Sequence, residues 1–260
     1  MPSPVTFNTA ARRASESEYP EQWNGLVGAW PLIEGGGATA FDFSGNGCSG
    51  SLVGGASWTI GSRGTELLFN GGTGYLNVPN ASKPDLGTGD FMFSAWIVAQ
   101  TLGGIGRGIA AELNPGPGLP QWWFREQGGG TLRFLTSDAS DMNYTTTNTL
   151  LSLNKQYFVA AVRRGTSVEI WIDGKLDSAA TGTIQNVTNT QPLVIGRFIE
   201  YWHGRIDDPR LYAIAPSADQ ILALYLRGPK SFVVPRRRRS AFAIQLAAKK
   251  LLMRRRRMSV

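Results

Sequence analysis

The chain has 260 residues, of which 42% are hydrophobic and 10% aromatic, enough apolar material for the core of one large domain. A single cysteine, Cys48, excludes an internal disulfide framework, and a single histidine, His203, excludes a multi-histidine metal site. The formal net charge is +7, but residues 229–260 hold 11 lysines and arginines and no acid, which leaves residues 1–228 near −4. The basic character therefore describes the C-terminal tail, and the body need not bind polyanions.

Targeting segments are not visible in the sequence. No apolar run reaches the roughly 18 residues of a membrane span, and the N-terminus lacks the charged and apolar regions of an ordinary secretory signal. Residues 1–24 contain Pro2, Pro4 and Pro20 but few large apolar side chains. They predict an N-terminal arm or leader that is ordered only against a partner.

From Gly25 onward, short runs of β-branched and aromatic residues alternate with turn residues. Glycine makes up 32 of the 260 residues, which suits a fold of strands and turns. Even spacing of such runs indicates an all-β sandwich. The runs are 52–53, 67–69, 75–78, 91–98, 121–125, 131–136, 157–163, 168–172, 193–195 and 205–212.

Turn and helix signals complete the prediction. Asp173-Gly174 predicts a type I′ hairpin, and residues 128–130, all glycine, predict a looser one. Ser217 and Gln220 form a capping-box pattern, so one short helix is expected after the last strand. Gly228 followed by proline would end it.

Several motifs together resemble laminin G-like jelly-roll domains of the concanavalin A-like lectin and glucanase fold. They lie at 25–32, 34–37, 41–47, 91–97, 158–163, 168–175, 204–212 and 217–221, in the family's order. The resemblance covers about residues 25–226 and implies an antiparallel jelly-roll β-sandwich. Pro209 departs from the family pattern, because proline cannot donate to a ladder, and predicts a bulge or an edge there. Tyr157 stands where the family often has tryptophan. The predicted organisation is an arm (1–24), a jelly-roll domain (25–228) and an Arg-rich tail (229–260).

Glycan or partner binding requires exposed aromatic faces with planar polar groups beside them. Strand alternation along 121–125 turns Trp122 and Phe124 inward and Trp123 with Arg125 outward. A second aromatic group follows Arg197 in a loop. The candidate ligand-binding residues are Trp123, Arg125, Arg197, Tyr201 and Trp202. The alternative is that these aromatics only cover the edge of the sandwich.

Members of the family often bind calcium, which takes six to eight oxygen ligands. Asp42 and Asn46 in the 42–47 loop, with Asp207 or Asp208 from the last strand, are the candidate ligands. The alternative is that Asp42 caps the turn and Asp207 forms an ion pair with an arginine.

Catalysis has one weaker candidate. Enzymes of this fold that resemble laminarinases use carboxylates on one strand, and alternation places Glu169 and Asp173 on one face around Trp171. Asp173 is explained more simply as the hairpin residue, and Glu169 as a strand residue facing solvent. We therefore expect a protein that is not an enzyme, with a glycoside hydrolase using Glu169 as an alternative.

The tail carries arginines at 236–239 and 254–257. Nucleic acid, an anionic membrane surface and a docking partner all remain open as its contacts, as does a solvated tail without contacts. A lectin-like module flanked by two arms predicts a structural or adhesion subunit of a virion, such as a phage capsid decoration or tail-fibre component. It would lie on the outer surface of the particle and contact other subunits through its arms. The alternative is a free carbohydrate-binding protein.

Overall fold

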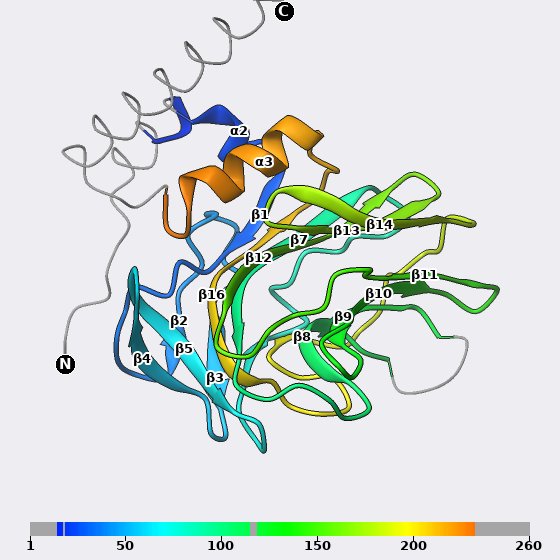
Figure 1. Cartoon of the computed structure of the whole chain (residues 1–260). Coiled ribbons are helices and arrows are strands. Elements are labelled where there is room, and N and C mark those ends of the chain that lie inside the picture. The colour runs from blue at the N-terminus through cyan, green and yellow to red at the C-terminus, as the bar shows by residue number, and fades with distance from the viewer. Residues whose placement is uncertain (1–14, 18, 115–118, 232–260) are drawn as a thin grey trace, which may run out of the picture. The chain divides into compact units, whose positions relative to one another are not determined.

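The computed structural model describes residues 15–17, 19–114 and 119–231. Two antiparallel sheets form the layers of a sandwich (Figure 1). The first sheet contains, in spatial order, β14 (Lys175–Thr181), β13 (Ser167–Ile172), β12 (Gln156–Arg164), β7 (Phe91–Ala99), β16 (His203–Tyr212), β5 (Gly64–Asn70) and β4 (Ser57–Gly61), with β1 (Leu26–Ala29) paired to β16. The second contains β11 (Met142–Thr146), β10 (Leu132–Ser137), β9 (Gln121–Glu126), β8 (Arg107–Glu112), β15 (Leu193–Ile195), β6 (Tyr75–Val78), β3 (Gly50–Val53) and β2 (Thr39–Ala40). The predicted all-β jelly-roll sandwich is confirmed.

The core lies between the sheets and is aromatic. Phe91 and Phe93 of β7 meet Trp122 of β9 at ring-centroid distances of 5.4 and 6.1 Å. Phe124 and Phe134 add an edge-to-face pair at 6.4 Å. All five side chains are fully buried. Alternation along the strands thus sends one set of residues inward, as the sequence predicted for Trp122 and Phe124.

The predicted turns and helix are present. Asp173 and Gly174 have φ of 51° and 77°, as a type I′ turn requires. Helix α3 (Ala218–Arg227) follows the last strand, and Ser217 and Gln220 cap it reciprocally. The register of β16 shifts between Asp207 and Arg210, so the bulge expected at Pro209 is confirmed.

Helix α3 packs against the outer face of the first sheet (Figure 1). The Tyr225 ring stacks on Trp96 of β7 at 5.7 Å and lies 6.3 Å from the Phe158 ring of β12. Trp96 and Phe158 are 8% and 3% exposed, although they point away from the core. The helix therefore gives this sheet a second apolar layer.

Residues preceding Gly25 also belong to the body. Gln22 of α2 (Pro20–Trp23) is 1% exposed, and its side-chain oxygen accepts a hydrogen bond from Arg210. Its backbone carbonyl accepts one from the Tyr212 hydroxyl at 3.2 Å. A buried arginine needs such acceptors, which explains why part of the expected arm packs here. Residues 1–14 and 232–260 of the predicted arm and tail lie outside the described residues.

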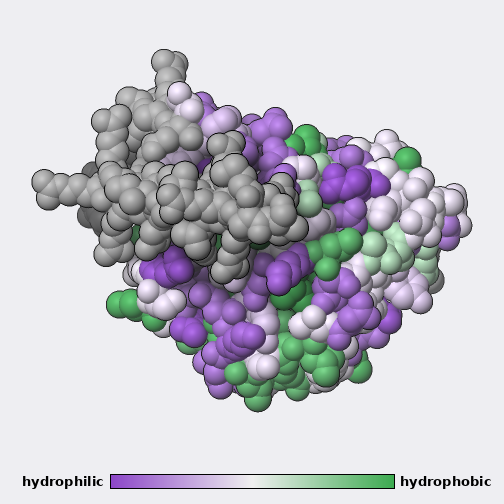
Figure 2. Space-filling view, turned by 45° about the horizontal axis from the view of Figure 1, so that its top comes forward, coloured by the Kyte–Doolittle hydropathy of each residue, from purple (hydrophilic) through white to green (hydrophobic). Residues whose placement is uncertain are grey.

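The surface is mixed in character. Figure 2 turns the side of α2 and α3 toward the viewer, and its described area alternates hydrophilic and hydrophobic residues, with a hydrophobic area along the lower edge. Within the described ranges, no helix has the length and apolar character needed to cross a membrane.

Candidate functional site

The outer face of the second sheet carries an apolar cluster away from the core. At its centre Trp123 of β9 is paired in register with Ala111 of β8 and Leu135 of β10. Phe198, in the loop after β15, meets the Trp123 ring at 4.9 Å. The full cluster is Ala111, Trp123, Leu135, Val194 and Phe198, with Tyr75 and Leu113 packed against it. Because α3 lies against the other sheet (Figure 1), this cluster is not covered by a helix of the described structure.

Two arginines cover the cluster in place of a helix. The Arg125 guanidinium carbon lies 4.5 Å from the Trp123 ring centre and 4.9 Å from that of Phe198. The Arg197 guanidinium lies 5.0 Å from the Tyr75 ring and 5.7 Å from the Tyr201 ring. Such stacking leaves the guanidinium edges free to donate hydrogen bonds.

We call this surface the arginine–aromatic face, and it consists of Tyr75, Trp123, Arg125, Arg197, Phe198 and Tyr201. Both arginines and both tyrosines are partly exposed, whereas Trp123 and Phe198 are 6% and 7% exposed. The structure thus brings four of the five candidate binding residues together. Trp123 reaches a ligand only if Arg125 moves, so the accessible groups are the two guanidiniums and the tyrosine rings.

The loops that border this face are tied to each other. Glu200 Oε2 accepts hydrogen bonds from the backbone N–H groups of Ile105 and Gly106 at 3.0 and 3.2 Å. Arg107 Nε donates to the Gly103 carbonyl, and Arg125 donates to the carbonyl of Ile105. The 103–106 loop therefore fixes the position of one arginine of the face.

Glu126 anchors the same loop from inside. Its side chain is fully buried, and Oε1 accepts hydrogen bonds from the backbone N–H groups of Gly103, Gly128 and Gly130. The 128–130 hairpin and the 103–106 loop thereby share one carboxylate. Gly108 is needed nearby, because a Cβ there would lie 2.0 Å from the Arg197 carbonyl carbon.

Trp202 is a correction to the predicted site. It is fully buried and belongs to the core between the sheets. Along this extended segment Tyr201 and His203 are partly exposed while Trp202, Gly204 and Ile206 are buried. The period of two therefore turns Trp202 inward. Trp202 lies an even number of residues before Ile206 and so points to the same side of the strand, which means that the sequence alone could have assigned it to the core.

Three residues on or beside this face were not predicted. Tyr75 alternates with the core residues Leu76 and Val78, so its outward direction was readable from the strand pattern. Arg133 of β10 faces outward between the core residues Leu132 and Phe134 in the same way. Phe198 lies in a loop, where no periodicity assigns a direction.

The candidate calcium ligands of the 42–47 loop already have hydrogen-bond partners within the protein. Asp42 Oδ1 accepts from the N–H groups of Ala29 and Ser44, and Oδ2 accepts from the Ser44 hydroxyl and the Cys48 N–H. Asn46 directs its amide N–H toward the Val27 carbonyl and the Ser44 hydroxyl. Oxygens occupied by donors do not fit a calcium ion, which needs free oxygen ligands. This loop instead matches the turn-capping alternative.

The other two candidate calcium ligands, Asp207 and Asp208, lie in β16. Asp208 binds Arg210 through both oxygens, at 3.2 and 2.7 Å, and both side chains are almost fully buried. Asp207 is 3% exposed in the same strand. Within residues 15–17, 19–114 and 119–231, no group of three or more acidic, histidine or cysteine side chains is placed to hold a metal.

Glu169, the alternative catalytic residue, also has two partners. It points to the outer face of the first sheet, opposite the core residues Val168 and Ile170, as predicted. It is 8% exposed rather than solvent-facing. Its Oε1 accepts from Arg164 at 3.0 Å and its Oε2 from the Trp171 indole at 2.8 Å. The Asp173 carboxylate accepts the Phe158 N–H beside the hairpin.

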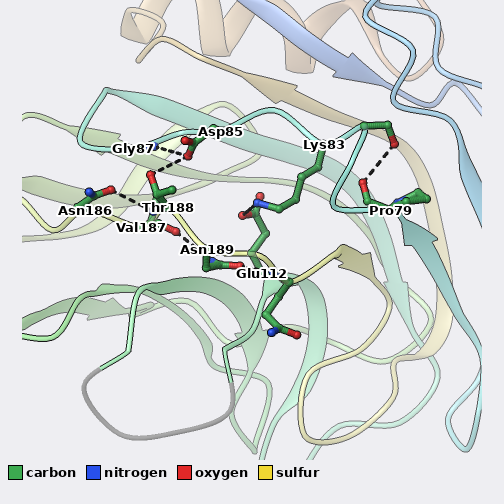
Figure 3. Close-up of polar contacts among 11 residues, drawn as sticks. Pro79, Lys83, Asp85, Gly87, Glu112, Asn186, Val187, Thr188 and Asn189 are labelled. Atoms are coloured by element: carbon green, nitrogen blue, oxygen red, sulfur yellow. Dashed lines mark hydrogen bonds and ion pairs between the residues drawn. The ribbon is translucent and has the colours of Figure 1, made fainter.

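At the other end of β8 a buried ion pair joins the strand to the loop that follows β6. Lys83 Nζ lies 2.6 Å from Glu112 Oε2, with 3% and 2% of the side chains exposed. Figure 3 shows Lys83 reaching Glu112 near Asp85, which accepts hydrogen bonds from the Gly87 N–H and the Thr188 hydroxyl. Burial raises the pKa of the Glu112 carboxyl, and the Lys83 ammonium opposes that shift. The contacts connect the segment after β6 with the one before β15.

Solved structures share this architecture. The binding domain of Paraclostridial Mosquitocidal Protein 1 superposes with a TM-score of 0.63 at 16% identity, over 77% of this chain and 52% of that one. The binding domain of botulinum neurotoxin DC, in complex with SialylT, gives 0.61 at 15% identity over 78% and 51%. The chain thus spans about half the length of these toxin domains. Domain 4 of AbnA, a GH43 extracellular arabinanase from Geobacillus stearothermophilus, in complex with arabinotriose, gives 0.60 at 15% identity over 76% and 97%. At such identities the likeness establishes the fold alone.

Sequence comparison assigns the family. No curated protein matches the chain. A laminin G-type family model does match over residues 70–222, which run from the end of β5 into α3 and include the whole arginine–aromatic face. The chain therefore belongs to the concanavalin A-like lectin/glucanases superfamily.

Proposed function

We propose that this protein is a non-enzymatic adhesion module that binds a glycan at the arginine–aromatic face. The observation that supports the proposal most is that Arg125 and Arg197 stack over the aromatic rings at the apolar cluster on the outer face of the second sheet. Arg197 in particular donates no hydrogen bond to any described residue, so its N–H groups are available to a ligand. Sugars bind where aromatic surface lies beside planar hydrogen-bonding groups.

Two named neighbours support the same choice by analogy. The arabinanase domain was solved with arabinotriose, and one neurotoxin domain with SialylT. Fold-level likeness alone does not transfer a ligand. The proposal for this chain therefore depends on its own arginine and tyrosine side chains.

Binding of the full chain to a glycan array tests the proposal. Arg197→Ala and Tyr201→Ala should each weaken the strongest signals about tenfold or more, as expected for a lost charged hydrogen bond or aromatic contact. Lys155→Ala is the matched control, because this exposed lysine also lies over a tyrosine, 4.6 Å from the Tyr157 ring, but beside the first sheet. Equal loss in the control, or no glycan bound by the wild type, would overturn the proposal.

The proposed setting is the outer surface of a virion, as a capsid decoration or tail-fibre component. The charge distribution supports it, since a body near −4 carries a segment of 11 basic residues without an acid, suited to attachment to an anionic or subunit surface. Mass spectrometry of purified particles should detect the chain in many copies. Its absence from particles, with glycan binding intact, would favour a free lectin.

A further inference from the structure

The arginines on the outer face of the second sheet lack carboxylate partners. Arg125, Arg133 and Arg197 take part in no ion pair among the described residues. Elsewhere in the described body four arginines, Arg164, Arg205, Arg210 and Arg227, each have a carboxylate partner, and Arg163 donates to backbone carbonyls instead. A body whose overall charge is near −4 therefore carries a local excess of positive charge on this face.

Two of these charges are placed against each other. Arg125 of β9 and Arg133 of β10 are direct partners in the register of the two strands and point to the same face. Like charges directly opposite each other across strands destabilise a sheet. Burial, and after it the charge of Arg133, lower the pKa of Arg125. An anion bound to Arg125 would weaken this repulsion.

The nearest carboxylates are engaged elsewhere. Glu126 and Glu200 attract Arg125 electrostatically, but Glu126 is buried and accepts three backbone N–H groups. Glu200 Oε2 accepts the N–H groups of Ile105 and Gly106. Both acids therefore hold the loop beside the face and leave the outer edges of the guanidiniums uncompensated.

From this charge pattern we infer that the glycan carries a carboxylate, which Arg125 and Arg197 bind. The inference rests on the proposed function and deepens it to a class of ligand, an acidic sugar. A planar guanidinium pairs a carboxylate through two parallel hydrogen bonds. The neighbouring tyrosines, Tyr75 and Tyr201, would contact the ring of the same sugar, because Arg197 lies over both.

Matched pairs of oligosaccharides test the inference by calorimetry with the full chain. One pair is a trisaccharide that contains a single uronic acid and its carboxyl-reduced neutral form. The other pair is a trisaccharide that contains a single sialic acid and its carboxyl-reduced neutral form. Each acidic ligand has one carboxylate, so the Arg-rich tail gains little from it. At least one acidic form should bind about 10- to 100-fold more tightly than its neutral partner. The pair that responds identifies the source of the carboxylate.

Variants assign the effect to this face. Arg197→Gln should remove most of the preference for the acidic form, and Arg197→Lys should retain part of it, because charge remains but the bidentate geometry is lost. Lys155→Gln should leave the preference unchanged. Circular dichroism should show that Arg197→Gln stays folded, since Arg197 makes no hydrogen bond to a described residue.

The outcomes separate the two proposals. Equal binding of acidic and neutral forms, lost in Tyr201→Ala, overturns the acidic ligand and leaves the glycan-binding function. Binding of no glycan overturns both. A preference for acidic forms that survives Arg197→Gln assigns them to another part of the chain and overturns the inference.

Discussion

The outer faces of the two sheets carry similar aromatic residues under different covers. On the first sheet Trp96 and Phe158 lie under Tyr225 of α3. On the second, Trp123 and Phe198 lie under the guanidinium of Arg125. Trp96 and Trp123 are almost equally buried, at 8% and 6%. The number of outward aromatics therefore does not distinguish the two faces, and our proposal of a binding face depends on the chemistry of what covers them.

The charged residues also differ between regions, since some are enclosed in ion pairs and others are not. Removing one partner of an enclosed pair is the substitution from which we expect the largest change in stability. Lys83→Met leaves the Glu112 carboxylate buried without its partner, 2.6 Å away in the wild type, and should cost about 3–5 kcal/mol of unfolding free energy. Burial already raises the pKa of Glu112, and loss of the ammonium raises it further. The folded state then holds a proton that the unfolded state releases, so the unfolding free energy of the variant should fall as pH rises.

Urea denaturation at pH 5 and pH 8 measures both effects. The double variant Lys83→Met, Glu112→Leu serves as the control, because it removes the isolated charge and should recover much of the loss. A single variant that loses less than about 1 kcal/mol, or is less stable at pH 5 than at pH 8, would show that the pair is not enclosed as described.

The cover of the first sheet provides the next test. Tyr225→Ala removes the ring that stacks on Trp96 and should destabilise the protein by about 2 kcal/mol, below the value for a fully buried aromatic. Glycan binding of the folded variant should not change. Leu226→Ala, at a residue 39% exposed on the same helix, is the control and should have little effect. A loss of binding in Tyr225→Ala would contradict the separation of the two faces.

Arg133→Gln should have a smaller effect of opposite sign. It relieves the repulsion with Arg125 across β9 and β10 and should stabilise the ligand-free protein by about 0.2–1 kcal/mol, more at low salt. Arg205→Gln is the matched control, because Arg205 lies 2.9 Å from Glu66 and its loss should destabilise. Thermal melts at two ionic strengths compare them. Destabilisation by Arg133→Gln would mean that its contacts with Thr146 and Tyr144 outweigh the repulsion.

The smallest expected effect is that of calcium. Because both oxygens of Asp42 accept donors from the protein, adding calcium or a chelator should not shift the melting temperature. A calcium-dependent increase that Asp42→Asn abolishes would show that the loop rearranges to bind the ion.

Strands with strong β-propensity and the capped helix were predictable from the sequence. β7 is a nine-residue strand with one polar residue, Ser94, and β12 has an apolar run from Tyr157 to Val162, and β9 alternates visibly around Trp123. β8 was missed because Arg107–Glu112 is rich in glycine and alanine, which have low strand propensity. β11 (Met142–Thr146) was missed because it is a polar strand at the edge of its sheet, and α2 was missed because it is a single turn of helix.

Part of the candidate site was predictable for the same reason. Alternation gave the outward direction of Trp123 and Arg125 in β9. It did not predict that the Arg125 guanidinium covers Trp123, or that Arg197 and Phe198 lie close to that strand. Contacts between loops that are distant in the sequence leave no periodic signal. The inward direction of Trp202 was readable, but its neighbours Tyr201 and His203 suggested a loop.

The 42–48 loop determines how reactive the single cysteine of the chain is. It places Cys48 at 2% exposure, and burial, with the nearby Asp42 charge, raises the pKa of its thiol to about 12. The reactive thiolate is therefore almost absent at neutral pH. As the chain has no other cysteine, it forms no disulfide within itself, so its folded state does not depend on the redox state of a cysteine pair.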